Sequence, residues 1–214
     1  MKTGTRALFF GNLKEFGQKG ILGQAPREKL KARGYIMKQF GGPAIFLDRD
    51  DINTDEIIPA KYLTEISKTA LKPHLLEDLL LDGIPYDRQS EKSQNAQVVV
   101  TRANFGCGSS REHAVWAFEV NDINVVIAES FARIFRQNMF NCGILAVELQ
   151  KDQLNQLFDM VGDILIFVDL GSCKLTASSN LDIQDSLIIQ FELNQFDQKL
   201  VSAGGWLAYA DTNY

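Results

Sequence analysis

The order of apolar and polar segments predicts a mixed α/β domain. From about residue 97 to residue 161, short apolar runs alternate with amphipathic segments of helical period, as in parallel strands joined by helices. Beyond residue 161, three apolar runs follow one another without long helical segments between them, which indicates antiparallel strands. A chain of 214 residues with 45% hydrophobic residues fits one domain with a buried core, with or without an appendage.

The first half of the chain holds fewer periodic segments. Residues 44–47 form an apolar run that predicts a strand, and four aspartates follow within residues 48–55. This acidic segment lacks the glycine and the final glutamate of an EF-hand loop, so we interpret it as turn chemistry and not as a calcium site. A leucine stripe predicts a helix over 71–81, the polar residues 83–95 predict a loop, and residues 97–102 predict the next strand.

Helical and strand-like patterns alternate in the second half of the chain. The helix at 130–141 is expected to begin with Ser130 as its N-cap and to pack through Ile134, Phe135 and Met139. The other predicted elements are helices at 112–120, 152–161 and 195–203, and strands at 123–128, 144–147, 163–168, 174–177 and 187–193.

Charge, hydropathy and cysteine content exclude several classes of protein. The net charge of −5 argues against nucleic-acid binding, and no apolar run approaches the ~18 residues that a membrane span needs. Cys107, Cys142 and Cys173 are widely spaced and odd in number, which suits a reducing cytoplasm better than a disulfide framework. Because His74 and His113 also lie far apart in the sequence, we expect no metal site built by this chain alone.

Residues 1–36 differ in composition from the rest of the chain. They contain eight Lys or Arg and two Glu, a net charge of +6, and they show no amphipathic pattern. The two glutamates and the absence of serine argue against a transit peptide. We therefore expect a disordered basic extension before a single domain at 37–214, with a transit peptide or an upstream start codon as alternatives.

A glycine-rich segment, Asn104–His113, lies between a strand-like run and a helical pattern. The start of a helix offers unpaired N–H groups and the positive end of the helix dipole to an anion. Gly106 and Gly108 allow the backbone to adopt a positive φ and to approach a ligand closely. The segment therefore predicts an anion site at the start of the helix.

Polar residues in the same segment fit this interpretation. Ser109 and Ser110 are good N-cap residues, and Ser109 and Glu112 have the spacing of a capping box. Arg111 adds a planar set of donors suited to a carboxylate. The alternative is a well-capped connection with no ligand; a dinucleotide fingerprint and a P-loop are excluded, because neither a third glycine nor Gly-Lys-Ser/Thr follows.

Two signatures carry a resemblance to a known family. The run Gly106–His113 resembles the signature of the swivel domain of the aconitase superfamily. The segment Asp51–Leu63 resembles a second signature, found in the small subunits of 3-isopropylmalate dehydratases. The resemblance covers about residues 40–210 and implies a three-layer β/β/α swivelling domain, as in the aconitase C-terminal domain.

The resemblance also implies an activity and a partner. The expected protein is a hydro-lyase subunit that interconverts 2-isopropylmalate and 3-isopropylmalate by dehydration and rehydration in leucine biosynthesis. It would act on this 2-alkylmalate only together with a large subunit, which carries a 4Fe–4S cluster whose iron takes the hydroxyl group; this chain would bind no cofactor. The alternatives are a small subunit for citramalate, homoaconitate or a methylthioalkylmalate, and a non-catalytic carboxylate-binding module.

Residue roles follow from the matched positions. Ser109 matches the base that removes the proton α to a carboxylate, and its alkoxide would need stabilisation by backbone N–H groups and Arg111. Glu112 and His113 are expected to be structural, and Cys107 to be a packing residue. The implied substrate-binding residues are Gly108, Ser110, Arg111, Thr54 and Asp55, and the implied specificity loop is Lys61, Tyr62 and Leu63.

Overall fold

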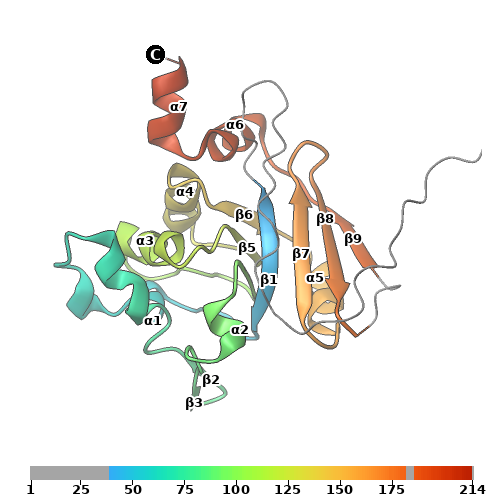
Figure 1. Cartoon of the computed structure of the whole chain (residues 1–214), viewed down its shortest axis with the longest axis horizontal. Coiled ribbons are helices and arrows are strands. Elements are labelled where there is room, and N and C mark those ends of the chain that lie inside the picture. The colour runs from blue at the N-terminus through green and yellow to red at the C-terminus, as the bar shows by residue number, and fades with distance from the viewer. Residues whose placement is uncertain (1–38, 182–185, 214) are drawn as a thin grey trace, which may run out of the picture. The chain divides into compact units, whose positions relative to one another are not determined.

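The computed structural model describes residues 39–181 and 186–213 (Figure 1). Residues Met37–Tyr214 form one compact unit. The expectation of a disordered extension at 1–36 lies outside the described residues.

A curled seven-stranded sheet organises the domain, in the order β6-β5-β4-β1-β7-β8-β9. The central strand β1 (Phe40–Leu47) joins two halves: its first residues pair antiparallel with β7, and its last residues pair parallel with β4, with Ala44 opposite Val98. The parallel half comprises β1, β4 (Val98–Thr101), β5 (Val125–Ala128) and β6 (Leu145–Glu148), and the antiparallel half comprises β7 (Ile164–Asp169), β8 (Lys174–Ser179) and β9 (Ser186–Gln190).

Helices cover the sheet. Helices α3 (Glu112–Val120) and α4 (Arg133–Asn141) connect the parallel strands and pack beside each other (Figure 1). Helix α6 (Gln195–Ala203) packs against α4 and extends this helical layer. Helix α5 (Lys151–Phe158) leads from the parallel to the antiparallel half, and α7 (Trp206–Asn213) ends the described chain. The two sheet halves and the helical layer confirm the predicted α/β class and its β/β/α layering.

Burial explains which sequence patterns predicted strands correctly. Every residue of β4 and β5 is buried, as expected for central parallel strands that are covered on both faces. In β7, by contrast, Ile164 and Ile166 are buried while Leu165 and Phe167 are exposed. The continuous apolar pattern of β4 and β5 therefore indicates burial on both faces of the sheet, and the alternating pattern of β7 indicates burial on one face only.

The predicted helix over 71–81 is wrong. This segment contains the end of a 3-10 helix, η2 (Lys68–His74), and then β2 (Leu80–Leu81). Pro73 cannot donate a backbone hydrogen bond, and Leu76 has a φ of 57°, which no α-helix accommodates. The buried leucines at 71, 76 and 79 are therefore brought inside by turns, although their spacing is similar to that of a helix.

Other boundaries also differ from the predictions. The expected loop at 83–95 contains β3 (Ile84–Pro85) and a short helix, α2 (Glu91–Gln94). Helix α4 has Ala132 as its N-cap, and the Ser130 hydroxyl instead accepts a hydrogen bond from the backbone N–H of Asn104 (2.9 Å). Ile134 is 50% exposed and is not a core residue, whereas the predicted packing residues Phe135 and Met139 are buried. Helix α7 was not predicted, because none of its residues is buried and it has no apolar stripe.

Candidate active site

Two loops meet at the carboxyl ends of β1 and β4. Because these strands are parallel neighbours, the loops that follow them leave the same edge of the sheet. Asn53 and Cys107 form a β-bridge, the Thr54 N–H donates to the Cys107 carbonyl (2.9 Å), and the Gly106 N–H donates to the Ile52 carbonyl (2.8 Å). The fold thereby brings together the two segments that the sequence marked as functional, although they are about 50 residues apart.

Both glycines of the loop have the predicted positive φ. Gly106 has a φ of 73° and Gly108 a φ of 91°. A Cβ atom on Gly106 would lie 2.2 Å from the Phe135 ring, so a side chain is excluded by space as well as by conformation. At Gly108 the nearest atom would be Thr54 Oγ1 at 3.5 Å, so only the backbone conformation requires glycine there.

The predicted capping of α3 is wrong. The N-cap is Arg111, and its side chain makes no capping hydrogen bond. Glu112 is the first helical residue, and its carboxylate accepts a hydrogen bond from Trp116 Nε1 (3.3 Å) instead of closing a capping box. Because no side chain caps α3, the N–H groups of its first turn remain able to bind an anion.

Ser109 is held by its backbone and not by its hydroxyl. The buried Thr54 donates from Oγ1 to the Ser109 carbonyl (3.0 Å). Ser109 and Ser110 are both exposed, and within the described part of the chain neither hydroxyl forms a hydrogen bond. The structure thus fixes the backbone of the loop while it leaves both hydroxyls available to a ligand.

Arg111 forms an ion pair with Asp55, through Nη1 and Oδ1. The arginine side chain is 16% exposed and the aspartate side chain is 52% exposed. Only Nη1 is engaged, so the remaining donors of the guanidinium can bind a carboxylate. Asp55 thus contacts Arg111, another of the residues predicted to bind substrate.

Asn53 and Glu56 stabilise the first loop, and sequence reasoning did not single them out. Asn53 is the N-cap of α1 (Thr54–Ile57): its Oδ1 accepts from the Asp55 N–H (2.9 Å), and the Glu56 carboxylate accepts from the Asn53 N–H (3.1 Å). Arg49 donates to the same carboxylate (2.5 Å). The spacing Asn-x-x-Glu was the available signal, since it is a variant of the capping box.

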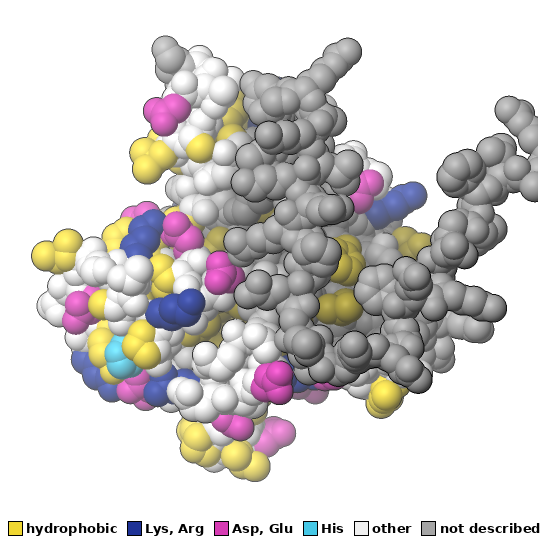
Figure 2. Space-filling view, viewed as in Figure 1, with side chains coloured by type: hydrophobic (Ala, Val, Ile, Leu, Met, Phe, Trp, Pro, Cys, Tyr) yellow, Lys and Arg dark blue, Asp and Glu magenta, His cyan; other side chains and the backbone are white. Residues whose placement is uncertain are grey.

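The predicted specificity loop is held by a residue that the sequence did not reveal. Lys61 and Tyr62 lie in the short helix η1 (Ala60–Tyr62). The Glu77 carboxylate accepts hydrogen bonds from Lys61 Nζ (2.8 Å) and Tyr62 Oη (2.9 Å), and it pairs with His74 Nδ1 (2.5 Å). The Tyr62 and His74 rings stack, with centroids 3.8 Å apart. Charged side chains of both signs gather on this side of the molecule, over α1 and α3 (Figure 2).

Hydrogen bonds determine the charge of Glu77. Its pKa is lowered to about 2, first by the hydrogen bond from Lys61 and then, against the opposing effect of burial, by those from His74 and Tyr62. The carboxylate is therefore ionised at any physiological pH. We call Lys61, Tyr62, His74 and Glu77 the Glu77 cluster.

A second contact fixes the other side of this loop. Lys68 forms an ion pair with Glu119 of α3 (Nζ to Oε2, 2.8 Å), and its Nζ lies 5.2 Å from the centroid of the Trp116 ring. Between the contacts of Glu77 and the ion pair of Lys68 with Glu119, the loop projects outward, and Ile66 is 97% exposed. The loop is thus fixed at both ends and open at its tip.

Cysteines do not form a metal site in the described residues. Burial raises the pKa of the Cys107 thiol, and Asp51 raises it further, so this thiol is a poor nucleophile. Residues 39–181 and 186–213 contain no group of three His, Cys, Asp or Glu side chains that could hold a metal ion. Within the same residues, no helix is both long and apolar enough to cross a membrane.

Comparison with known protein families identifies the class of proteins to which this fold and this glycine-rich loop belong. The family model of the aconitase C-terminal domain matches residues 36–152, so the chain belongs to that family.

Curated relatives narrow the similarity within the family. The 3-isopropylmalate dehydratase small subunit of Leptospira interrogans is 36% identical over 173 residues, covering 75% of this chain and 81% of the relative. That of Deinococcus deserti is 37% identical over 163 residues, with the same coverage. A crystal structure of 3-isopropylmalate dehydratase from Methanocaldococcus jannaschii superimposes with a TM-score of 0.64 at 29% identity, over 82% of this chain and 95% of that chain.

Proposed function

We propose that this chain is the small subunit of a 3-isopropylmalate dehydratase, a hydro-lyase of leucine biosynthesis. The observation that carries the proposal is the similarity to curated small subunits, at 36–38% identity over 68–75% of the chain. The reaction is the interconversion of 2-isopropylmalate and 3-isopropylmalate by loss and re-addition of water. The small-subunit relatives imply a large-subunit partner, and we expect both in the cytoplasm.

We infer that Ser109 removes the proton α to a substrate carboxylate. A serine hydroxyl is a poor base unless its alkoxide is strongly stabilised. The uncapped N–H groups at the start of α3 and the guanidinium of Arg111 lie in the same loop and provide positive charge for that purpose. The exposed hydroxyl, without a hydrogen-bond partner among the described residues, is available to the substrate.

The remaining loop residues bind and position the substrate in this proposal. Arg111 pairs with a substrate carboxylate, and Ser110 and the backbone at Gly108 add hydrogen bonds to it. Thr54 acts indirectly: its hydroxyl donates a hydrogen bond to the Ser109 carbonyl and so holds the backbone of the loop in position. Asp55 orients Arg111 and does not itself bind the carboxylate, since two carboxylates repel each other.

The 4Fe–4S cluster is proposed to belong to the large subunit. Cluster ligands are thiolates gathered around one site. In this chain Cys107 lies in the loop after β4, Cys142 follows α4, and Cys173 lies between β7 and β8, so the three do not form such a set.

Co-expression with the large subunit of the same organism tests the proposal. The purified pair should hydrate the alkene intermediate and interconvert the two isopropylmalates, while the isolated chain should be inactive and contain no iron. Assays with citramalate, homoaconitate and methylthioalkylmalate substrates distinguish the related hydro-lyases. A carboxylate-binding module would instead bind the anion tightly alone and show no turnover with the partner.

A further inference from the structure

The last described helix, α7, carries apolar side chains that lie on the surface. None of its residues is buried, although the run Trp206–Ala210 contains no charged residue. The Trp206 side chain is 45% exposed and that of Leu207 is 81% exposed. In Figure 2, hydrophobic side chains lie on the surface over this helix. A helix of eight residues is marginal in water unless an apolar face packs against something, so the exposed side chains of α7 point to contact with another molecule.

Helix α6 extends this apolar surface. The two helices pack together, and Phe196 of α6 is 49% exposed. Its ring meets the Tyr209 ring edge to face, with centroids 5.9 Å apart, and Trp206 stacks beside Tyr209 at 6.2 Å. We call Phe196, Trp206, Leu207 and Tyr209 the α7 patch. Single exposed apolar residues are ordinary, whereas a contiguous group of them marks an interaction site.

The α7 patch lies at the edge of the sheet opposite to the candidate active site. A Cβ atom on Gly143 would lie 2.6 Å from the backbone of Gly204, and one on Gly205 would lie 2.4 Å from the Asn141 carbonyl oxygen. Residues 141–143 lead from α4 into β6, so the junction of α6 and α7 is held at the amino ends of the parallel strands. The loop with Ser109 follows the carboxyl ends. Figure 1 accordingly shows α7 and the β2–β3 hairpin at opposite ends of the view.

This position separates the α7 patch from the surface that the large subunit needs. A large subunit that completes the active site must cover the carboxyl ends of the strands, and this step rests on the proposed function. The match to the aconitase C-terminal domain ends at residue 152, before α6 and α7 begin. The α7 patch therefore requires a partner other than the large subunit.

Charge favours a second copy of this chain as that partner. The whole chain has a net charge of −5, so two copies repel each other over most of their surfaces. On α6 and α7 the exposed charged residues are Lys199 and Asp211, one of each sign, while Asp197 is buried and caps its own helix through Asn194. A two-fold axis brings the same surface of both copies together, and here it does so without net repulsion.

We propose that the α7 patch is the interface of a symmetric homodimer. Trp206 and Leu207 of each copy pack against those of the other, and Phe196 and Tyr209 widen the contact. Lys199 and Asp211 lie around it in water. The patch is smaller than a standard interface, so the dimer is weak, with a Kd of about 1–100 µM. The Ser109 loop of each copy remains free to meet a large subunit.

Sedimentation velocity of the isolated full-length chain tests the proposal. Between about 1 and 500 µM the mass should rise from that of a monomer to that of a dimer. The chain has two tryptophans, so Trp116→Phe leaves Trp206 as the sole reporter, and its emission should shift to shorter wavelength as the dimer forms. A chain that stays monomeric over this range, or a dimer that leaves the emission of Trp206 unchanged, would refute the interface. Neither measurement depends on turnover, so the result is independent of the proposed function.

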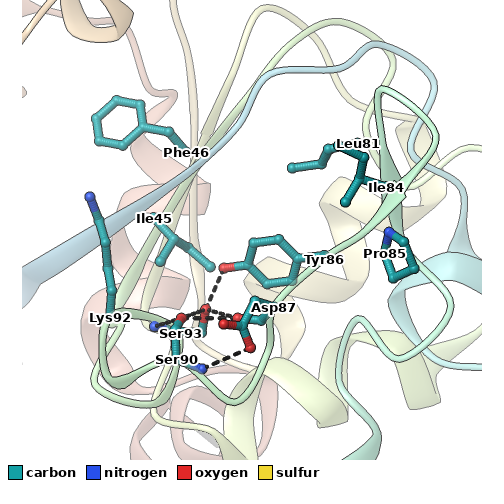
Figure 3. Close-up of a pocket in the computed structure, with 10 residues that line it drawn as sticks. All are labelled: Ile45, Phe46, Leu81, Ile84, Pro85, Tyr86, Asp87, Ser90, Lys92 and Ser93. Carbon is teal, nitrogen blue, oxygen red and sulfur yellow. Dashed lines mark hydrogen bonds between the residues drawn. The ribbon is translucent and has the colours of Figure 1, made fainter.

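Matched variants locate the contact. Leu207→Asp places a charge in the interface and should weaken self-association by at least about tenfold. Its melting temperature should be unchanged, since Leu207 is 81% exposed. Ile84→Asp is the control: Ile84 is 68% exposed and lines a cavity of about 450 Å³ between the β2–β3 hairpin and β1 (Figure 3). A dimer that survives Leu207→Asp, or that Ile84→Asp weakens equally, would overturn the proposal.

Two further measurements exclude the other occupants of the α7 patch. Leu207→Asp should bind the large subunit as tightly as the wild type does, and a loss would assign the patch to the large subunit. A chain that starts at Met37 should dimerise as the full chain does, and a loss would assign the contact to residues 1–36. Either loss would overturn the homodimer. Failure of the wild type to bind the large subunit would instead contradict the proposed function alone.

Discussion

The hydroxyl of Ser109 provides the sharpest prediction at the scale of single residues. Ser109→Ala should lower kcat by about 10²–10⁴-fold, because general base catalysis is lost, while KM changes little. A lost N-cap is expected to lower the melting temperature by about 2–4 °C. Because Ser109 does not cap α3, the decrease for Ser109→Ala should be smaller. Steady-state hydration of the alkene with the large subunit present and thermal melting measure the two effects.

Ser110→Ala is the matched control for this substitution, since Ser110 is equally exposed and lies in the same loop. As a proposed substrate ligand it should raise KM more than it lowers kcat. A folded Ser109→Ala protein that keeps more than about a tenth of the wild-type kcat would assign proton removal to the partner chain.

Arg111→Lys should impair the enzyme although the charge is kept. Lysine cannot present two parallel donors to a carboxylate, so we expect a raised KM, a reduced kcat and a loss of about 10–100-fold in kcat/KM. Asp55→Asn should act in the same direction but more weakly, because Asp55 only orients the guanidinium. Kinetics of Arg111→Lys equal to those of the wild type would remove Arg111 from the substrate site.

At the scale of elements, the glycine-rich loop should tolerate a methyl group at one glycine better than at the other. Gly108→Ala should cost about 1–2 kcal/mol of stability, since alanine must adopt a positive φ but its Cβ atom meets its neighbours only at ordinary van der Waals distances. Gly106→Ala should cost about 2–5 kcal/mol, because the Cβ atom also collides with Phe135. Denaturant unfolding of both variants measures the difference, and equal losses would contradict the packing seen around Gly106.

The Glu77 cluster predicts a pH-dependent stability. A carboxyl group whose pKa is lowered on folding stabilises the protein above its unfolded pKa, and this contribution is lost as the pH falls towards the folded pKa. Glu77→Gln should therefore lower stability at neutral pH by up to about 1 kcal/mol. The difference from wild type should shrink as the pH falls from about 4.5 towards about 2.

Glu65→Gln is the control for the cluster. Glu65 lies in the same loop and is exposed, and its side chain forms no hydrogen bond or ion pair with the described residues, so its replacement should produce no such pH dependence. In the assembled enzyme, Glu77→Gln should also alter KM more than kcat if the loop contacts substrate. A stability difference that stays constant down to pH 2 would show that the charge of Glu77 does not hold the loop.

At the scale of the whole molecule, the segment before Met37 should be dispensable. All described helices and strands lie after Gln39, and residues Met37–Tyr214 form one compact unit. A protein that starts at Met37 should keep its melting temperature and, with the large subunit, nearly all of its activity. A large loss of turnover with unchanged melting would place the removed residues at the subunit interface.

Much of the architecture could be predicted from the sequence, and the exceptions share a cause. The strands β4 and β5 and the helix α3 were located within about two residues, since their apolar patterns reflect burial on both faces or on one. The helix over 71–81 failed because leucines buried by turns have the same spacing as a helical stripe. Periodicity indicates that residues are buried and not which backbone conformation buries them.

The sequence by itself determined the class of fold and the place of the glycine-rich loop, because short-range periodicity and the need of glycine for positive φ are local properties. Only the tertiary structure decided how the site is held. The ion pair of Arg111 with Asp55 spans 56 residues, and the contact of Glu77 with Lys61 spans 16. Such contacts depend on how the parallel strands and their loops meet in space, so no local pattern specifies them.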